Sequence, residues 1–538
     1  MDIALPLNPD FCGPIRMPVL DLEAPKSIVT LKSLLADRAL TVKRPRRQPP
    51  SLIFSLPAEM LAETFLQATA DDQSASSMFM PMHLHFVLSQ VCGLWRAVAL
   101  HTPSLWCRVV LHLAGRTAGF NGIKSLAKTC FERSCDLPLA LIITSSVFDS
   151  YKIPNLSMEL VLPVRHRIRH LELKLPVILT ESIFKLPKNS LRALKTINIT
   201  ALVQDNGGSW FRSMSALEGA PLLDSITLSC VYSPRTPDLR IDPYMAGLSW
   251  DRLTELRLHD LEIRCDDVFY FLEMTSALVR CSLNLRIIPP LVPVIPFTGV
   301  PAPADLALPK PKAPVTVPAL RVFELAISSG SHNAPADFFF NRMVFPSLKE
   351  LSIKFIEKWS LLPCATLTQL QTRSSFSLEQ FTLASRTGDS LLPFLQSNPL
   401  LWRVQLVLCA LELVPLATAL TLKAETGDGA PILPRLRILT LADHWPEETP
   451  ASSWTHATKA VDCMVRSRRR APSINGDSNN VRLEGFTFGS RASLSAKKIA
   501  RFERWRAEGM RIRTVIVPHE SQHPSRSGYN RILWQELE

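Results

Sequence analysis

The stretch "LKELSI" (Leu348–Ile353) shows the spacing that organises most of this 538-residue chain. It places an apolar residue, two others, an apolar residue, one other and an apolar residue in series. Eleven further copies occur, most of them about 23–30 residues from the next. They are "IRHLEL" from Ile168, "LKTINI" from Leu194, "LDSITL" from Leu223, "LTELRL" from Leu253, "LVRCSL" from Leu278, "LRVFEL" from Leu320, "LEQFTL" from Leu378, "LWRVQL" from Leu401, "LRILTL" from Leu436, "LEGFTF" from Leu483 and "IRTVIV" from Ile512.

Spacing and interval together are typical of a leucine-rich repeat. The second half of each copy is a short strand whose alternating side chains point inward, and the leading residue packs beneath it. The rest of the unit returns along the other side as helix or turn. A single unit cannot bury its apolar side, so neighbouring units must stack. We therefore predict an α/β fold, a leucine-rich-repeat-like solenoid with short parallel strands on one face and helices or turns on the other.

Proline takes a fixed place before several of these units. It stands two residues ahead of the leading leucine at Pro221, Pro318, Pro346, Pro399 and Pro434. Because proline fixes φ and disfavours helix in the residue before it, we expect it to end the preceding helix and direct the chain into the strand. The proline-rich stretch 287–318 falls between two units. We interpret it as a solvent-exposed insertion; docking of a proline-reading domain is the alternative.

The composition favours a folded protein in a reducing compartment. With 46% hydrophobic and 20% charged residues, the chain can bury a large interior, and its length exceeds one compact core. The N-terminus lacks the basic and apolar regions of a secretory signal. The most apolar long window, Leu400–Leu422, contains Arg403, Glu412 and Pro415, which does not suit a membrane span. Eleven cysteines without a CxxC pair fit reduced thiols. We expect the protein in the cytoplasm, the nucleus or both, and not in a membrane.

The chain ahead of the repeats predicts a small helical unit. In "LPAEMLAETFLQA" (Leu56–Ala68), Pro57 suits the first turn of a helix and Glu59 favours the helix dipole. After a polar loop, "LSQVCGLWRAVALHTPSLW" (Leu88–Trp106) predicts a second helix, which Thr102-Pro103 ends. Its apolar residues share one face of that helix: Leu88, Val91, Cys92, Trp95 and Ala99.

These two segments resemble an F-box, in the version common in fungal F-box proteins with leucine-rich repeats. Order and spacing fit, apart from a longer loop between the first and second helices. The matching residues are Leu56, Pro57, Glu59, Leu61, Phe65, Leu88, Ser89, Val91, Cys92, Trp95, Arg96, Ala99, Pro103, Leu105 and Trp106.

The resemblance implies a function without catalysis in this chain. F-box proteins are substrate receptors of SCF-type ubiquitin ligases; the F-box binds a Skp-family adaptor, which connects to cullin and RING subunits, and the repeats bind a protein substrate. The resemblance assigns adaptor contacts to Leu56, Pro57, Leu61 and Phe65. It assigns a role in the small core or in the adaptor contact to Val91, Cys92, Trp95, Leu105 and Trp106. Because ubiquitin transfer belongs to other subunits, we expect no catalytic residue, no cofactor and no metal.

Other motifs were weighed as enzyme signatures. "HESQH" (His519–His523) matches the H-E-x-x-H zinc motif, which requires a helix, but prolines bracket it and no apolar stripe runs through it. We interpret it as part of a polar tail. His83 and His85 lack a nearby cysteine or carboxylate with which to hold a metal. The chain has no glycine-rich nucleotide loop and no nucleophile elbow. We interpret Cys130 and Cys135 as packing residues.

The positive charge of the chain is concentrated near its end. The net charge is +12, and the segment Arg466–Arg513 holds 13 basic and four acidic residues. "SAKKIARFERWRAEG" (Ser495–Gly509) is either the helix of a terminal repeat, with arginine stems covering apolar surface, or a docking surface for an acidic protein or a phosphate backbone. The alternative function is therefore a repeat scaffold without a ligase link that binds an acidic protein or nucleic acid here. We do not expect nucleic acid as the partner, because no nucleic-acid motif accompanies the charge.

The predicted division of the chain has four parts. Residues 1–50 form a flexible, proline-rich and basic segment, whose "KRPRRQPP" is a solvated linker or a nuclear import signal. Residues 51–112 form the F-box-like helical domain. Residues 113–517 form the solenoid, interrupted by the insertion 287–318. Residues 518–538 form a C-terminal tail.

Overall fold

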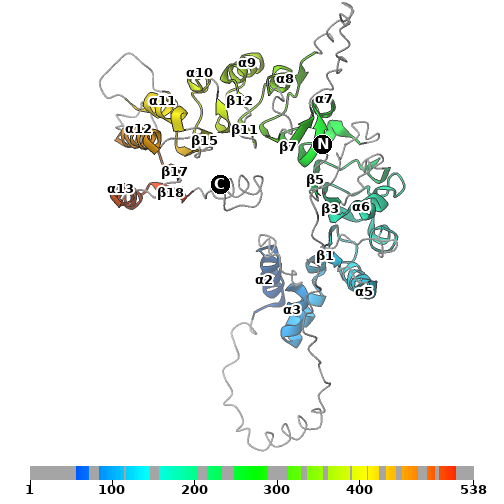
Figure 1. Cartoon of the computed structure of the whole chain (residues 1–538). Coiled ribbons are helices and arrows are strands. Elements are labelled where there is room, and N and C mark those ends of the chain that lie inside the picture. The colour runs from blue at the N-terminus through cyan, green and yellow to red at the C-terminus, as the bar shows by residue number, and fades with distance from the viewer. Residues whose placement is uncertain are drawn as a thin grey trace, which may run out of the picture. The chain divides into compact units, whose positions relative to one another are not determined.

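A computed structural model of the protein divides the chain into two compact units, Met1–Glu63 and Thr64–Glu538 (Figure 1). The described residues are 56–71, 84–113, 117–145, 157–203, 215–232, 248–288, 313–328, 336–355, 361–387, 390–408, 410–422, 432–443, 451–470, 482–490 and 496–516. The predicted N-terminal segment, the tail with its HESQH motif, His83 and residues 289–312 of the proline-rich insertion lie outside them. The predicted domain boundaries stay a prediction.

The front of the chain is helical. Helix α2 (Ala58–Asp71) runs through the boundary between the two units. In the second unit, α3 (Leu84–Val91) and α4 (Gly93–Leu100) precede the 3₁₀ helix η2 (Pro103–Trp106). The single helix predicted over Leu88–Ala99 is wrong, because the backbone is extended at Cys92 (φ −157°, ψ 173°). The Cys92 Sγ accepts a hydrogen bond from the Trp95 N–H at 3.5 Å and caps α4, so the helix starts again one residue later.

The second unit is built on one sheet of fourteen parallel strands among its described residues. The strands lie beside one another in chain order, and Figure 1 shows the helices along one side of them. The predicted α/β fold with a long parallel sheet is therefore confirmed. The strands are β1 (Arg108–Leu113), β2 (Leu139–Ser145), β3 (Ile168–Pro176), β4 (Thr196–Val203), β5 (Ser225–Tyr232), β6 (Glu255–Arg264), β7 (Arg280–Ile288), β9 (Val322–Ser328), β11 (Glu350–Phe355), β13 (Gln380–Ala384), β15 (Arg403–Leu408), β16 (Ile438–Asp443), β17 (Gly485–Ser490) and β18 (Arg511–Ile516).

Helices and helical turns connect successive strands. They are α5 (Thr117–Arg133), the π-helical turn η4 (Ser157–Val161), η5 (Leu162–Val164), α6 (Val177–Phe184), η6 (Ser215–Leu217), η7 (Trp250–Arg252), α7 (Cys265–Met274), α8 (Ala336–Asn341), α9 (Cys364–Ser374), α10 (Leu392–Gln396), α11 (Ala410–Leu420), α12 (Ala451–Arg470) and α13 (Ala496–Ala507). Two small parallel pairs lie apart from the main sheet: β8 (Val315–Thr316) with β10 (Met343–Val344), and β12 (Leu361–Leu362) with β14 (Arg386–Thr387). No helix in the described ranges combines the length and the apolar character needed to cross a membrane.

The repeat spacing becomes columns of buried side chains. Leu171, Ile197 and Ile226 are paired across β3, β4 and β5, and all three are buried. A second column lies two residues further along each strand, and the leading residues, such as Leu194, are buried as well. Burying one such side chain contributes about 1.5–3 kcal/mol, so the stack of repeats supplies the core that no single unit has.

Backbone hydrogen bonds extend the pairing beyond the strands. From β4 to β17, the N–H of the residue before each strand of the main sheet donates to a carbonyl of the preceding unit. Lys195 donates to Arg169 at 2.7 Å, and Asp224 donates to Lys195 at 2.9 Å. The same bonds recur up to the last strand, where Arg511 donates to Glu484 at 2.9 Å. Each turn is therefore held in register with its neighbour before its strand begins.

The prolines ahead of the leading leucines lie in four-residue turns. The N–H of Leu348 donates to the Phe345 carbonyl at 3.3 Å, which closes a four-residue turn with Pro346 at its second position. The fixed φ of proline suits that position. The predicted role as a helix stop is wrong for Pro346, since strand β10 precedes it, and for Pro318, since β8 precedes it.

Three strands depart from the predicted repeats. β1 and β2 precede the first predicted unit, although Trp106, Val109 and Leu111 reproduce the repeat spacing with a tryptophan in the leading place. The predicted register of "IRTVIV" is wrong. Ile512 pairs with Phe486, so it is the first inward residue of β18 and not a leading residue. The run of apolar residues after Ile512 obscured this three-residue shift in the sequence.

A buried amide joins two neighbouring units. The side chain of Asn398 is fully buried between α10 and the next strand. Its Nδ2 donates to the Gln371 Oε1 at 2.9 Å and to the Phe394 carbonyl at 2.8 Å, and its Oδ1 accepts the Leu378 N–H at 3.3 Å. A buried polar group is stabilising only when it is hydrogen-bonded. Asn398 therefore holds the α9 and α10 units to each other.

We expect Asn398→Leu to lower the free energy of unfolding by about 3 kcal/mol, because it leaves several buried polar groups without partners. Asn198→Leu, at an outward-facing position on β4, is the matched control and should change stability by less than about 0.5 kcal/mol. Denaturant unfolding followed by circular dichroism measures both. Equal effects of the two substitutions would contradict the structural role of Asn398.

Candidate functional site

The predicted adaptor-contact residues at the start of α2 differ in exposure. In the first unit, Leu56 is 39% exposed and Pro57 and Met60 are exposed, whereas Leu61 is buried. The Leu61 N–H donates to the Pro57 carbonyl at 3.1 Å, which closes the first turn of the helix. In the second unit, Phe65 is buried. Leu56 and Pro57 are thus available to a partner, whereas Leu61 and Phe65 are buried core residues, each in its own unit.

Trp106 is the centre of a small aromatic core in the second unit. It is fully buried, and its Nε1 donates to the Ala99 carbonyl at 2.8 Å. The rings of His85 and Phe86 lie 4.7 Å and 5.1 Å from the Trp106 ring, centroid to centroid. The guanidinium carbon of Arg133, on α5, lies 4.3 Å from the same ring. Trp106 therefore joins α3, α4 and η2 to the first helix of the repeat part.

Trp95 makes a second set of contacts on α4. Its ring lies 4.9 Å from that of Phe65, and its N–H donates to the capping Cys92. The Arg96 Nε donates to the Ser89 carbonyl at 2.9 Å and ties α4 back to α3. Of the nine predicted site residues, the structure thus brings Phe65, Cys92 and Trp95 together. Leu105 is buried in η2 beside Trp106.

Val91 does not join this core. It is 55% exposed at the end of α3, because the break at Cys92 turns it away from the interior. Val87, Leu94 and Leu100 are also exposed on α3 and α4. In the second unit, residues 84–100 thus hold four of the twelve large apolar side chains that the described part exposes. Concentrated apolar exposure marks surfaces that bind other proteins.

Sequence reasoning missed part of this surface. Val87, Leu94 and Leu100 lie off the single apolar stripe that was expected for a continuous helix. Their signal in the sequence is that the segment 84–100 is apolar on more than one side, which exceeds what a small core can bury.

The outward side of the sheet is polar. There, side chains from neighbouring strands are hydrogen-bonded in pairs: the Thr200 Oγ1 and Ser229 Oγ lie 2.8 Å apart, and the Ser282 Oγ donates to the Glu324 Oε2 at 2.8 Å. Arg257 donates to the Glu255 carboxylate at 2.6 Å. Since the leucines point inward, these outward residues are the candidates for contact with a protein substrate.

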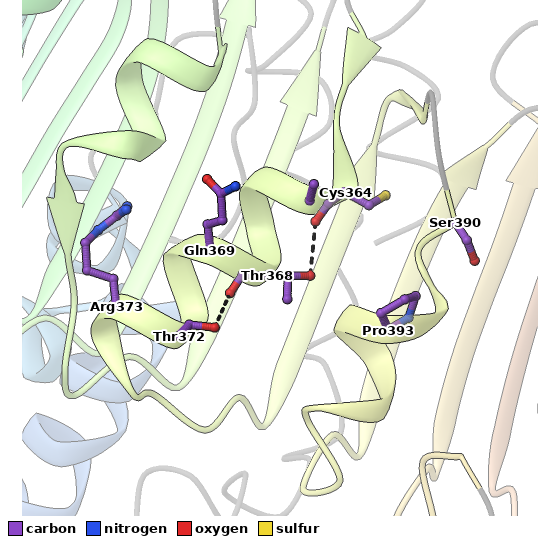
Figure 2. Close-up of a pocket in the computed structure, with 8 residues that line it drawn as sticks. Cys364, Thr368, Gln369, Thr372, Arg373, Ser390 and Pro393 are labelled. Atoms are coloured by element: carbon purple, nitrogen blue, oxygen red, sulfur yellow. Dashed lines mark hydrogen bonds between the residues drawn. The ribbon is translucent and has the colours of Figure 1, made fainter.

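A cavity of about 710 Å³ lies along α9 and α10. Figure 2 shows the side chains that line it. The Thr368 and Thr372 hydroxyls donate to carbonyls of their own helix, those of Cys364 and Thr368. The guanidinium of Arg373 donates to the Met343 and Phe340 carbonyls. The described lining residues present hydroxyl, thiol, amide and guanidinium groups to this cavity.

His85 and the two cysteines singled out in the sequence differ in their exposure. His85 is buried in the aromatic core, and no group of three metal-binding side chains occurs within the described ranges. Cys130 is buried in α5, and burial raises the pKa of its thiol to about 11, which keeps it protonated near neutral pH. Cys135 is exposed and lies just after α5.

No protein-family model matches this chain, and no curated protein matches it.

We expect Trp106→Ala to lower the free energy of unfolding by about 3–5 kcal/mol, because it removes a fully buried indole. Val91→Ser changes an exposed apolar residue nearby and should stay within about 0.5 kcal/mol of the unaltered protein. Urea unfolding followed by tryptophan fluorescence and circular dichroism measures the difference. If Val91→Ser were as destabilising as Trp106→Ala, Val91 would have a core role and not a surface role.

Proposed function

We propose that this chain is the substrate-recognition subunit of an SCF-type ubiquitin ligase. Its F-box-like helices would bind a Skp-family adaptor, which connects to cullin and RING subunits, and the repeats would bind a protein substrate. The chain itself would carry out no chemistry and need no cofactor. Ubiquitin transfer would take place on the other subunits, in the cytoplasm or nucleus.

One observation carries this proposal. The segments that resemble an F-box also expose apolar side chains: Leu56 ahead of α2, and Val91 and Leu94 around the α3–α4 break. Residues in the same segments that are buried, above all Trp106, hold the helices in place. Within the second unit, exposed apolar side chains on helices that pack around a buried core suit a contact with another protein.

The repeat part supports the second half of the proposal. Its outward side presents a continuous row of polar and charged side chains, such as Glu324 and Arg257, on strands fixed by backbone pairing. Rigid strands with variable side chains suit the binding of one protein surface. The substrate would be selected by these outward residues.

The proposal predicts that the full chain co-purifies with a Skp-family adaptor and that Leu56→Ala with Pro57→Ala abolishes this. Val91→Asp should also weaken adaptor capture by at least about tenfold, because it places a charge in an apolar contact. Affinity capture with proteasome and neddylation blocked, followed by quantification of the adaptor, measures both effects.

Ile178→Asp is the matched control. Ile178 lies on α6 and is 54% exposed, close to the exposure of Val91, but it belongs to the repeat part. It should leave adaptor capture unchanged. Unchanged capture by the Leu56→Ala, Pro57→Ala variant would rule out the F-box assignment.

A second candidate function is a scaffold that binds an acidic protein or nucleic acid through the basic end of the chain. The charge of α12 and α13 favours it, but not every arginine there is available. Arg468 is 2% exposed and donates to the Leu420 and Leu433 carbonyls at 2.8 and 2.9 Å. Salt-sensitive binding that is lost when the exposed Arg504 and Arg506 of α13 are replaced by glutamate, together with no adaptor capture, would favour the scaffold.

A further inference from the structure

Helices α12 and α13 enclose a cavity of about 520 Å³ that is lined mainly by arginine. Both helices are labelled in Figure 1. The lining residues come from three segments of the chain: α12, the residues just before β17, and α13 with the residue that follows it. It consists of Arg466, Arg469, Arg482, Arg501, Arg504, Trp505 and Glu508.

Two carboxylates neutralise part of this charge. The Asp462 Oδ2 accepts hydrogen bonds from Arg466 on its own helix and from Arg501 on α13. The Glu508 carboxylate forms an ion pair with the Arg469 Nη2. Among the described residues, five guanidinium groups against these two carboxylates leave an excess of three positive charges around this cavity.

Arg469 is the least satisfied of these arginines. Its side chain is only 7% exposed, and its Nη1 has no hydrogen-bond partner within the described residues. Its guanidinium carbon lies 6.0 Å from the Trp505 ring centroid, and the Arg466 Nε is also buried without a partner. Burial and the nearby charge of Arg482 lower the pKa of Arg469. Buried donors without partners cost free energy, so an acceptor in this cavity would be stabilising.

The chemistry of that acceptor follows from the donors. Arginine presents planar pairs of N–H groups that match two oxygens of one anion. A phosphate monoester carries close to two negative charges near neutral pH and three terminal oxygens, so it can accept from several arginines at once. A single carboxylate offers half the charge and two oxygens. The cavity is larger than a phosphate group alone needs, which leaves room for the group that carries the phosphate.

We propose that the cavity between α12 and α13 is a binding site for the phosphate group of a phosphate monoester, with Arg469 at its buried end and Arg482 and Arg504 at its exposed side. The phosphate would belong either to a phosphorylated side chain of a polypeptide or to a small phosphorylated molecule. The site does not depend on adaptor binding, so it stands or falls independently of the proposed function.

The test uses the full chain and isothermal titration calorimetry at constant ionic strength. The probes are a phosphoserine peptide with neutral flanking residues, the same peptide without phosphate, and glycerol phosphate as a small phosphate monoester. We expect saturable binding of at least one phosphate probe with one site per chain, and no comparable binding of the unphosphorylated peptide. Tighter binding of the phosphopeptide identifies a polypeptide source, and tighter binding of glycerol phosphate identifies a small molecule.

The variants Arg482→Gln and Arg504→Gln keep the fold testable, because both arginines are exposed. Each should weaken binding of the phosphate probe by about tenfold. Arg435→Gln, at an exposed arginine outside the cavity, is the control and should change the affinity by less than about twofold. Capture of the adaptor by Arg482→Gln should equal that of the unaltered chain. The proposal is overturned if neither phosphate probe binds, if the unphosphorylated peptide binds equally well, or if both cavity variants bind like the unaltered chain.

Discussion

The backbone pairing between successive units is the constraint on which the rest of this structure depends. Each strand is parallel to the next, and from β4 to β17 the residue before the strand is already hydrogen-bonded to the preceding unit, as Lys195 is to Arg169. Because side chains alternate along a strand, a slip of one residue would turn every leucine outward. The register therefore decides at once which side chains form the core and which are offered to partners.

Much of this register could be predicted from the sequence, because the repeat spacing of "LKELSI" encodes it directly. What failed was local. The spacing of the apolar residues predicts one continuous helix, but the helix breaks at Cys92. Cys92 caps the start of α4 with its side chain, and the spacing of apolar residues contains no signal for such a cap. Trp106 has the spacing of a leading residue, but its match to the F-box pattern left β1 unrecognised. Near the end of the chain, several apolar residues in a row allowed more than one register for β18.

For the candidate sites too, the sequence indicated which residues take part, and only the structure showed how they are arranged. That Val91 belongs to the site came from the F-box resemblance, whereas its exposure came only from the structure, because it depends on the break at Cys92. Likewise the sequence showed an excess of arginine near the end of the chain, but not its distribution. Arg468 and Arg469 are neighbours in sequence, yet Arg468 donates its hydrogen bonds to backbone carbonyls and Arg469 lines a cavity. Residues from α12, from the start of β17 and from α13 meet there only because the repeats stack.

We propose that the exposed apolar residues of α3 and α4 attach the chain to a larger assembly. Site-specific photo-crosslinking tests this most directly. A benzophenone amino acid is placed at Val91, or at the equally exposed Ile178 on α6, in the full chain mixed with a Skp-family adaptor. If Val91 lies in the adaptor contact, we expect a crosslink to the adaptor from position 91 and none from position 178. Equal crosslinking at the two positions, or none at position 91 while the adaptor remains bound to the chain, would contradict it.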